Sequence, residues 1–558
     1  MANAKTDNSW LWLLLILILA AQLRFYGLDF GKPFTFHPDE TKLVSQAGRL
    51  LDTKFMDKDA YFGIRVYPPF FTYILAAAMG GYIVFNLLTG RFDSLAAVKT
   101  AYQTDSFQFI MVSRSLVVLF GVGLVLLIYL IGARLYSKKV GLLAALLSAT
   151  SFALVRNSHF GTVDIPATFL GMAVIYFCIN VMQKGRSRDY ILAALFIALA
   201  TATKFSMLLF VLPLVYAHMS RYKWQELARA ALDKKIWLAA AACLLFFLVA
   251  CPLIWLDFKE TWGGIIGTSR FESVGKVGSG GGLLSYWTGD QSAGFGVFYP
   301  NSIPGLFGAA LTVIAALGVV YLLIRRRKSD WLLLFCLVPV YFMFEKMSIK
   351  AMRHILPIIP ILILAATIFL ADILDRVKGK LGVVLTALTF GILAVTQTAA
   401  AVSYHKKLKA PDPRAGAATW LKQNVPAGAA VAVEAFPPCF AANRDSSGYT
   451  IYETNWTSRS KTRRAEFMQF VAEKDSIFYI ADDFTRQTFS WKYTKAKYPD
   501  LARDRLEFFQ WLEESAEKIK VFQSDNNLIQ PTITIYRLLN PKTDQSEEKQ
   551  SASAEHDR

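Results

Sequence analysis

From residue 10 to residue 402, long apolar runs alternate with short polar loops. A run of about 20 apolar residues can cross a bilayer as a helix, and shorter runs can cross as tilted pairs. The pattern predicts a mainly α, polytopic membrane protein of about eleven transmembrane helices. The expected spans are residues 10–28, 107–131, 140–155, 165–181, 190–203, 205–219, 236–255, 304–324, 331–344, 353–374 and 381–402.

Basic residues concentrate in five short loops, which follow the expected spans ending at residues 131, 181, 219, 324 and 374. The positive-inside rule places these loops in the cytoplasm. The loop after residues 10–28 and the polar C-terminal region then lie outside. A twelfth apolar stretch, residues 70–88, cannot make a net crossing in this topology. We expect it to lie along the outer membrane face or to dip into it.

The polar pattern also predicts domain organisation. Residues 1–403 form the expected transmembrane domain, in which 29–106 are a first outer loop with juxtamembrane helices and 257–303 are an outer glycine-rich loop. Beyond residue 404, a helical stretch at 413–424 and strand-like runs at 430–434, 476–480 and 532–536 predict a small extracytoplasmic α/β domain at 404–540. Residues 541–558 are polar and are expected to be a disordered tail.

Composition supports the membrane assignment. The 558 residues are 54% hydrophobic and 18% charged, with mean hydropathy +0.36, whereas soluble domains are about a quarter charged. The net charge of +18 is explained by the basic loops, so no nucleic-acid partner is expected. The five cysteines form no CxxC pair, which argues against zinc-finger and redox sites.

The first outer loop contains the sequence His37-Pro38-Asp39-Glu40. Carboxylates beside hydrocarbon are costly, so a pair of them is a candidate functional site. The alternative is a helix start, because Pro38 suits a first helical position and the two acids suit its positive end.

On the predicted topology, further polar residues lie on the same outer face: His159, Asp164, Lys204 and Arg353, with Arg114 about two turns inside its span. Carboxylates can act as general base, and cations can neutralise a phosphate leaving group. Together they suit the transfer of a group from a membrane-embedded lipid carrier.

Each of these residues also has a structural interpretation. Asp164 could cap the following helix, Lys204 could reach to the membrane interface, and Arg353 could be a topological anchor that needs an anionic partner. His37 and His159 could bind a divalent metal with the acids, although the chain has no HxxxH or HExxH spacing.

The order of several motifs resembles the GT-C type membrane glycosyltransferases, in the branch that holds protein O-mannosyltransferases and the bacterial lipid A aminoarabinose transferase. The resemblance covers residues 10–402, and 412–434 look like the outer domain of bacterial members. The family often has His-Pro-Pro where this chain has Tyr67-Pro68-Pro69. The other motifs are Asp39-Glu40, Ser113-Arg114-Ser115-Leu116, Thr162-Val163-Asp164-Ile165-Pro166, Ala202-Thr203-Lys204-Phe205 and Arg353-His354-Ile355-Leu356-Pro357.

The resemblance implies a polyprenyl-phosphate-linked sugar donor and inverting transfer to a hydroxyl of a protein, lipid or glycan acceptor. It places the protein in the cell inner (plasma) membrane among membrane lipids, with the site and the C-terminal domain facing the periplasm or exterior. Asp39 would be the base, Glu40 its neighbour and Asp164 the second acid. Lys204 and Arg353 would contact the donor phosphate.

Two other functions stay open. A transporter or flippase of lipid-linked sugars would need polar groups near mid-membrane, and the expected spans are nearly free of charge at their centres. A non-catalytic membrane assembly protein would act through its outer domain.

Overall fold

The computed structural model describes residues 8–52, 67–252, 258–259, 263, 285–288, 302–345, 352–434, 448–456, 462–490, 494–495, 498–524 and 530–539. Most of the glycine-rich loop expected at 257–303, and all of the tail expected at 541–558, lie outside these residues. The chain divides into two compact units. The first is Met1–Ser269, Ser302–Lys346 and Met352–Lys406, and the second is Arg270–Asn301, Met347–Ala351 and Lys407–Arg558.

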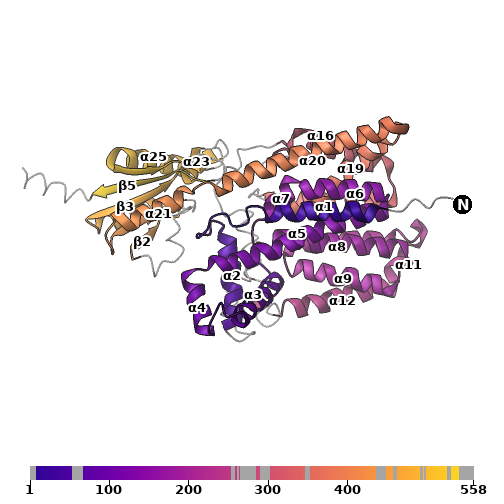
Figure 1. Cartoon of the computed structure of the whole chain (residues 1–558), viewed down its shortest axis with the longest axis horizontal. Helices are drawn as coiled ribbons and strands as arrows, with labels where there is room; N and C mark the ends of the chain where they lie inside the picture. Colours follow the sequence, from indigo (N-terminus) through magenta and orange to yellow (C-terminus); the bar gives the residue numbers. More distant parts are fainter. Residues whose placement is uncertain are drawn as a thin grey trace, which may run out of the picture. The chain divides into compact units, whose positions relative to one another are not determined.

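The first unit is a helical bundle. The helices α1, α5, α6, α8, α9, α12, α16, α19 and α20 run in a common direction (Figure 1). Its principal helices are α1 (Ser9–Phe25), α5 (Phe107–Leu135), α6 (Lys138–Thr150), α7 (Phe152–Asn157), α8 (Asp164–Gln183), α9 (Ser187–Thr201), α10 (Val211–Met219), α11 (Leu227–Leu232), α12 (Lys234–Ala250), α16 (Ile303–Arg325), α17 (Lys328–Glu345), α18 (Met352–Ile355), α19 (Ile359–Leu374) and α20 (Gly379–Lys409).

Six helices among the described residues are long and apolar enough to cross a membrane: Phe70–Leu88, Phe107–Leu135, Asp164–Gln183, Ile303–Arg325, Arg353–Leu374 and Gly379–Asn424. Ser9–Phe25 and Phe205–Met219 are shorter apolar helices. This confirms a mainly helical polytopic membrane protein, while the count of eleven spans stays a prediction. Several expected spans are short as helices; α6 has 13 residues and α9 has 15. At 1.5 Å per residue each is about 20 Å long, less than the roughly 30 Å hydrocarbon core.

Three helices in the expected first outer loop gather at one end of the bundle: α2 (Pro38–Asp52), α3 (Phe70–Leu88) and α4 (Leu95–Thr104). In Figure 1 α3 is seen nearly end-on, across the direction of α5 and α8. This is the arrangement expected for a helix that lies at the membrane face. That α3 makes no net crossing stays a prediction.

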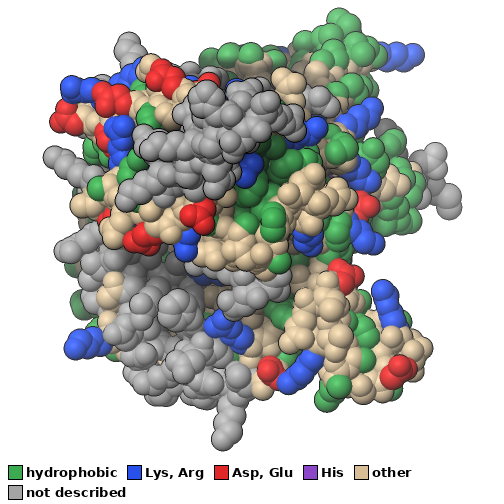
Figure 2. All heavy atoms as spheres, turned by 90° about the vertical axis from the view of Figure 1, so that its left-hand side faces the viewer, with side chains coloured by type: hydrophobic (Ala, Val, Ile, Leu, Met, Phe, Trp, Pro, Cys, Tyr) green, Lys and Arg blue, Asp and Glu red, His purple; other side chains and the backbone are tan. Residues whose placement is uncertain are grey.

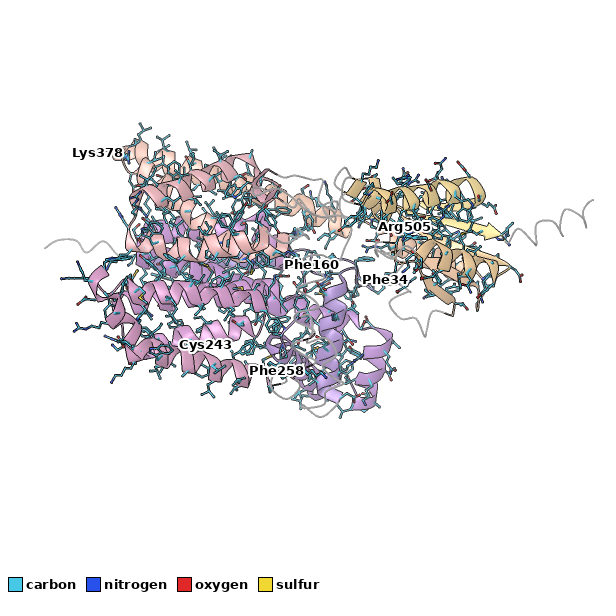
Figure 3. All side chains as sticks on the ribbon, turned by 180° about the vertical axis from the view of Figure 1, so that it is seen from behind. Phe34, Phe160, Cys243, Phe258, Lys378 and Arg505 are labelled. Atoms are coloured by element: carbon cyan, nitrogen blue, oxygen red, sulfur yellow. The ribbon has the colours of Figure 1, made fainter. Side chains whose placement is uncertain are left out.

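The expected cytoplasmic loops lie at the other end. α11, within one basic loop, is at the far end of the bundle from α2–α4 (Figure 1). Figure 3 shows Lys378, in another basic loop, and Phe160 at opposite ends of the bundle. The basic loops and the polar residues around Phe160 are therefore segregated along the bundle.

The second unit contains a five-stranded sheet of order β2-β1-β3-β5-β4. β1 (Ala430–Val433) pairs in parallel with β2 (Thr450–Glu453) and β3 (Ser476–Asp482), whereas β5 (Ile533–Leu539) is antiparallel to β3 and to β4 (Glu517–Phe522). The expected strands correspond to β1, β3 and β5. The two strands that the sequence pattern missed are the sheet edges, which lack a continuous apolar run because their side chains are mostly exposed or half-buried.

Helices cover both faces of this sheet. On one face α21 (Pro413–Asn424) packs Ala417, Ala418 and Leu421 against Val431 and Val433. The other face is covered by α22 (Arg463–Ala472) and α25 (Pro499–Ser515), which pack around the fully buried Trp456. α23 (Asp483–Ser490) follows β3. Strand residues alternate between the two cores because successive side chains point to opposite faces.

Charged side chains on the surface of the second unit often pair with each other, as Arg463 does with Glu466 and Arg503 with Asp500. Figure 2, a view of one face of the whole molecule, likewise shows acidic and basic side chains interspersed and apolar side chains gathered in separate patches. Such exposed pairs contribute little to stability, about 0–1 kcal/mol each.

Candidate active site

The acidic pair opens helix α2. Pro38 is its first residue, and Asp39 and Glu40 lie in its first turn. The helix-start interpretation of this stretch is therefore confirmed. The two acids also contact cations from distant segments, while their role in a functional site stays a prediction. Successive helical residues differ by about 100° in direction. Asp39 and Glu40 consequently face different surroundings.

Asp39 pairs with Arg353, whose Nη1 donates to Oδ2 of the carboxylate. The hydroxyl of Tyr67 donates to the same oxygen at 3.2 Å. The Asp39 side chain is 18% exposed and the Arg353 side chain 35%. This ion pair is therefore accessible from outside the protein.

A second ion pair adjoins the first. Nζ of Lys204 donates to Oδ1 of Asp164 at 2.8 Å and to the backbone carbonyl of Arg353 at 3.3 Å. The Lys204 side chain is 14% exposed, and Asp164 is buried. We call these four residues, Asp39, Arg353, Lys204 and Asp164, the acid–cation cluster. Its formal charge is zero, and segments far apart in the sequence supply it.

The hydrogen bonds of the cluster bear on the structural interpretations of its members, while their functional roles stay predictions. The Asp164 side chain pairs with Lys204 and Thr162 and makes no capping hydrogen bond to α8. Lys204 is not a free cation, because its Nζ donates to Asp164. The anionic partner of Arg353 is Asp39.

Glu40 and Arg114 form a separate pair in the protein interior. Nε and Nη2 of Arg114 donate to the two carboxylate oxygens at 2.8 and 2.9 Å, and both side chains are fully buried. Arg114 also donates to the carbonyls of Leu28 and Phe30, and the backbone N–H of Gly161 donates to Glu40 at 2.7 Å. This pair ties the first outer loop to α5 and to the segment before α8.

The two histidines occupy different places. Nδ1 of His37 accepts from the backbone N–H of Asp39 at 3.3 Å, and its ring lies 4.9 Å from that of Phe160. His159 is buried, with ring nitrogens 2.8 and 2.9 Å from the carbonyls of Val155 and Tyr26, and its ring lies 3.7 Å from His405. Within the described residues no three His, Cys, Asp or Glu side chains are grouped so as to hold a metal.

Local charges determine the protonation of the site. Burial alone would raise the pKa of Asp39, but the Arg353 guanidinium, His37 and the Tyr67 hydrogen bond together hold it below its usual value of 3.8. Burial lowers the pKa of His37, although Asp39 and Glu40 oppose this shift. At neutral pH Asp39 is therefore a carboxylate and His37 a neutral acceptor.

Comparisons with known proteins support the architecture. Residues 107–255 match the family described as dolichyl-phosphate-mannose-protein mannosyltransferase. The structure of ArnT from Cupriavidus metallidurans bound to undecaprenyl phosphate aligns over 95% of this chain and 98% of its own, with TM-score 0.53 and 12% identity. The archaeal oligosaccharyltransferase AglB from Archaeoglobus fulgidus, in complex with an inhibitory peptide and a dolichol-phosphate, aligns over 94% and 74%, with TM-score 0.59 and 13% identity. The chain has the fold of GT-C type membrane glycosyltransferases. A comparison with curated proteins finds no match.

The family match and the fold together confirm the resemblance to GT-C enzymes. The matched segment carries Arg114, Asp164 and Lys204 but neither Asp39 nor Arg353. Half of the acid–cation cluster therefore comes from outside the matched segment.

Two contributors were not among the candidate residues. Tyr67 was noted only as part of a motif, although its hydroxyl contacts Asp39. Gly161 donates to Glu40, and a side chain there would meet Oγ of Ser113 at 2.5 Å. The place of Tyr67 in the Tyr67-Pro68-Pro69 motif is a signal that could have identified it. Glycine is a common loop residue, so nothing in the sequence alone distinguishes Gly161.

Proposed function

We propose that this GT-C chain is an inverting glycosyltransferase that moves a sugar from a polyprenyl-phosphate donor to an acceptor hydroxyl at the outer face of the membrane. The observation that carries the proposal is the acid–cation cluster, in which a partly exposed carboxylate lies beside two cations. The site lies at the end of the bundle opposite the basic loops, which supports an outer-face location in the inner (plasma) membrane.

Asp39 is the proposed base. Within the described residues its Oδ2 accepts from Arg353 and Tyr67, while Oδ1 accepts no hydrogen bond and can take the proton of an acceptor hydroxyl. The acceptor oxygen bonds to the anomeric carbon from the face opposite the leaving group. The bond from that carbon to the donor phosphate oxygen breaks, and the phosphate keeps the electron pair. A carboxylate with a low pKa suffices because the phosphate is a good leaving group and the base needs only partial proton transfer in the transition state.

Lys204 and Arg353 are the proposed phosphate contacts. An ammonium has three donors. Among the described residues Lys204 uses two of them, on Asp164 and the Arg353 carbonyl, which leaves one. A guanidinium has five donors, and Arg353 directs Nη1 to Asp39. Both cations can therefore hold their acidic partners and still stabilise charge that develops on the phosphate.

Asp164 holds Lys204 in place, and the pair Glu40–Arg114 positions the start of α2 without touching substrate. The similar structures of ArnT and AglB were determined with undecaprenyl phosphate and a dolichol-phosphate, which supports a lipid phosphate as the donor carrier here. The acceptor is a protein, lipid or glycan hydroxyl.

The test is Asp39→Asn in the purified full chain, reconstituted with a polyprenyl-phosphate-linked sugar and a hydroxyl acceptor. Loss of a general base is expected to lower kcat by about 10²–10⁴-fold. The matched control is Asp52→Asn at the other end of α2, where the exposed carboxylate pairs only with Lys99 among described residues. Wild-type turnover by a well-folded Asp39→Asn protein would refute the base assignment. Exchange of labelled lipid-linked sugar without any sugar transfer would instead favour a transporter.

A further inference from the structure

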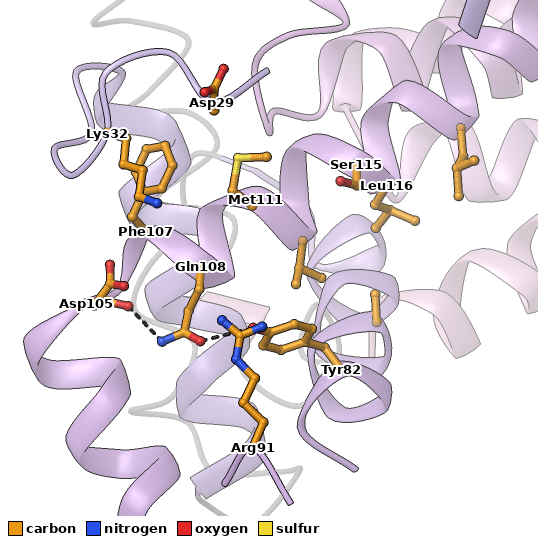
Figure 4. A pocket seen from close by; sticks show the side chains of 13 residues that line it. Asp29, Lys32, Tyr82, Arg91, Asp105, Phe107, Gln108, Met111, Ser115 and Leu116 are labelled. Carbon is orange, nitrogen blue, oxygen red and sulfur yellow. Dashed lines mark hydrogen bonds between the residues drawn. The ribbon is translucent and has the colours of Figure 1, made fainter. Parts of the chain in front are cut away.

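A cavity of about 610 Å³ lies beside α5, between α5 and α3 (Figure 4). We call it the α3–α5 cavity. None of the four residues of the acid–cation cluster lines it. Ligand pockets have volumes of about 300–1,000 Å³, so this cavity is large enough to hold part of a ligand.

One stripe of α5 forms the long wall of the cavity. Phe107, Met111, Ser115 and Leu119 recur at every fourth position, and such residues lie on one face of a helix. They extend over about 18 Å at 1.5 Å per residue, close to the roughly 15 Å depth of one leaflet of hydrocarbon. Leu119, at the deep end, is 62% exposed on a helix apolar enough to cross the membrane. The deep end therefore opens toward lipid chains.

Polar and charged groups surround the other end. Lys32 and Arg91 reach toward Gln108 from opposite sides (Figure 4). Gln108 accepts from the Tyr82 hydroxyl at 3.0 Å and donates to the backbone carbonyl of Asp105 at 3.1 Å. Asp29 and Asp105 also line the cavity, at separate places along it (Figure 4). Two cations and two acids give the cavity lining no net formal charge.

We propose that the α3–α5 cavity binds a zwitterionic phospholipid, one whose headgroup carries a phosphate and a primary amine. One acyl chain lies along α5 toward Leu119. The phosphate lies between Lys32 and Arg91, and the amine lies near Asp29 and Asp105. A headgroup that is only anionic matches the cations but not the acids, since like charges brought together are unfavourable. This site does not depend on the proposed glycosyl transfer.

The cavity itself is tested by filling it. The full chain is purified in mild detergent, mixed with phosphatidylethanolamine, and its retained lipid is counted by native mass spectrometry. Leu119→Trp fills the deep end and is expected to lower the occupancy of one bound lipid by about tenfold. Leu126→Trp is the matched control, because Leu126 is another exposed leucine of α5 but does not line the cavity. If the two variants retained the same amount of phosphatidylethanolamine, and both had the melting temperature of the wild type, the proposed lipid site would be refuted.

The headgroup is tested with phosphatidylethanolamine and phosphatidylglycerol in competition. The wild type is expected to retain the amine-bearing lipid preferentially. Asp105→Asn should reduce that preference, while Lys32→Gln with Arg91→Gln should weaken both lipids. Lys184→Gln, an exposed cation outside the cavity, should change neither. Equal retention of the two lipids by the wild type would refute the zwitterionic assignment.

Discussion

Asp39 and Glu40 are neighbours in the first turn of α2, yet their surroundings are of opposite kinds. Glu40 is sealed in the interior, with both oxygens bonded to Arg114 and one also to the Gly161 amide. Asp39 is partly exposed and has one oxygen free of hydrogen bonds among the described residues. Each carboxylate has an arginine partner, but only one can meet a substrate.

We infer from the comparison that accessibility separates an ion pair that only supports the structure from one that can take part in chemistry. A fully buried pair with complete hydrogen bonding holds elements in place, and losing one partner is costly. A partly exposed pair with donors to spare can exchange its contacts for those of a substrate.

The largest expected effect is on stability. Glu40→Ala leaves the buried Arg114 charge without its partner and should lower the free energy of unfolding by about 3–5 kcal/mol. Asp39→Ala should cost far less, because Arg353 is exposed enough to be solvated. Chemical denaturation in detergent measures both. Comparable losses for the two variants would remove the distinction between them.

The next largest effect is on the donor. Lys204→Met removes a proposed phosphate contact and leaves buried Asp164 unpaired, so kcat/KM for the lipid-linked donor should fall by an amount equivalent to about 2–5 kcal/mol. Arg114→Met is the comparison variant. The dependence of its turnover on donor concentration, measured on the folded protein only, should match that of the wild type. A normal donor KM and kcat for folded Lys204→Met would exclude the phosphate role.

The third effect is on pH dependence. Because the pKa of Asp39 lies below 3.8, its carboxylate stays charged above that pH, and kcat/KM should show no acid limb from this group between pH 7 and 5. In Arg353→Gln, burial acts without the guanidinium to oppose it, so the pKa of Asp39 should rise. The acid limb then moves toward neutral pH. An unchanged profile in an active Arg353→Gln protein would show that this carboxylate does not control the rate.

The smallest effect concerns an exposed pair. Lys99 and Asp52 have side chains 67% and 61% exposed, so Lys99→Ala should change the free energy of unfolding by about 0–1 kcal/mol and leave turnover unchanged. The thermal unfolding of Lys99→Ala is compared with that of Glu40→Ala. The difference shows how much more the buried ion pair contributes to stability than the exposed one. A loss as large as that of Glu40→Ala would contradict the role given to burial.

Much of the fold was predictable from residue patterns. Apolar runs identified the bundle helices, and the apolar stretches at β1, β3 and β5 identified the central strands. The edge strands β2 and β4 were not predicted, because exposed strands need no apolar run. In the site, the criterion of a charge beside hydrocarbon selects Asp39, Asp164, Lys204 and Arg353. Tyr67 and Gly161 are uncharged, so this criterion does not select them.

The sequence by itself determined that the chain is a polytopic membrane protein, which of its loops are basic and which charged residues are candidates, because hydropathy and charge act locally along the chain. The tertiary structure alone decided which acid meets which cation. Asp39 is 314 positions from Arg353 and Glu40 is 74 from Arg114. Partners so far apart are chosen by helix packing, and burial then fixes whether a pair supports the fold or faces a substrate.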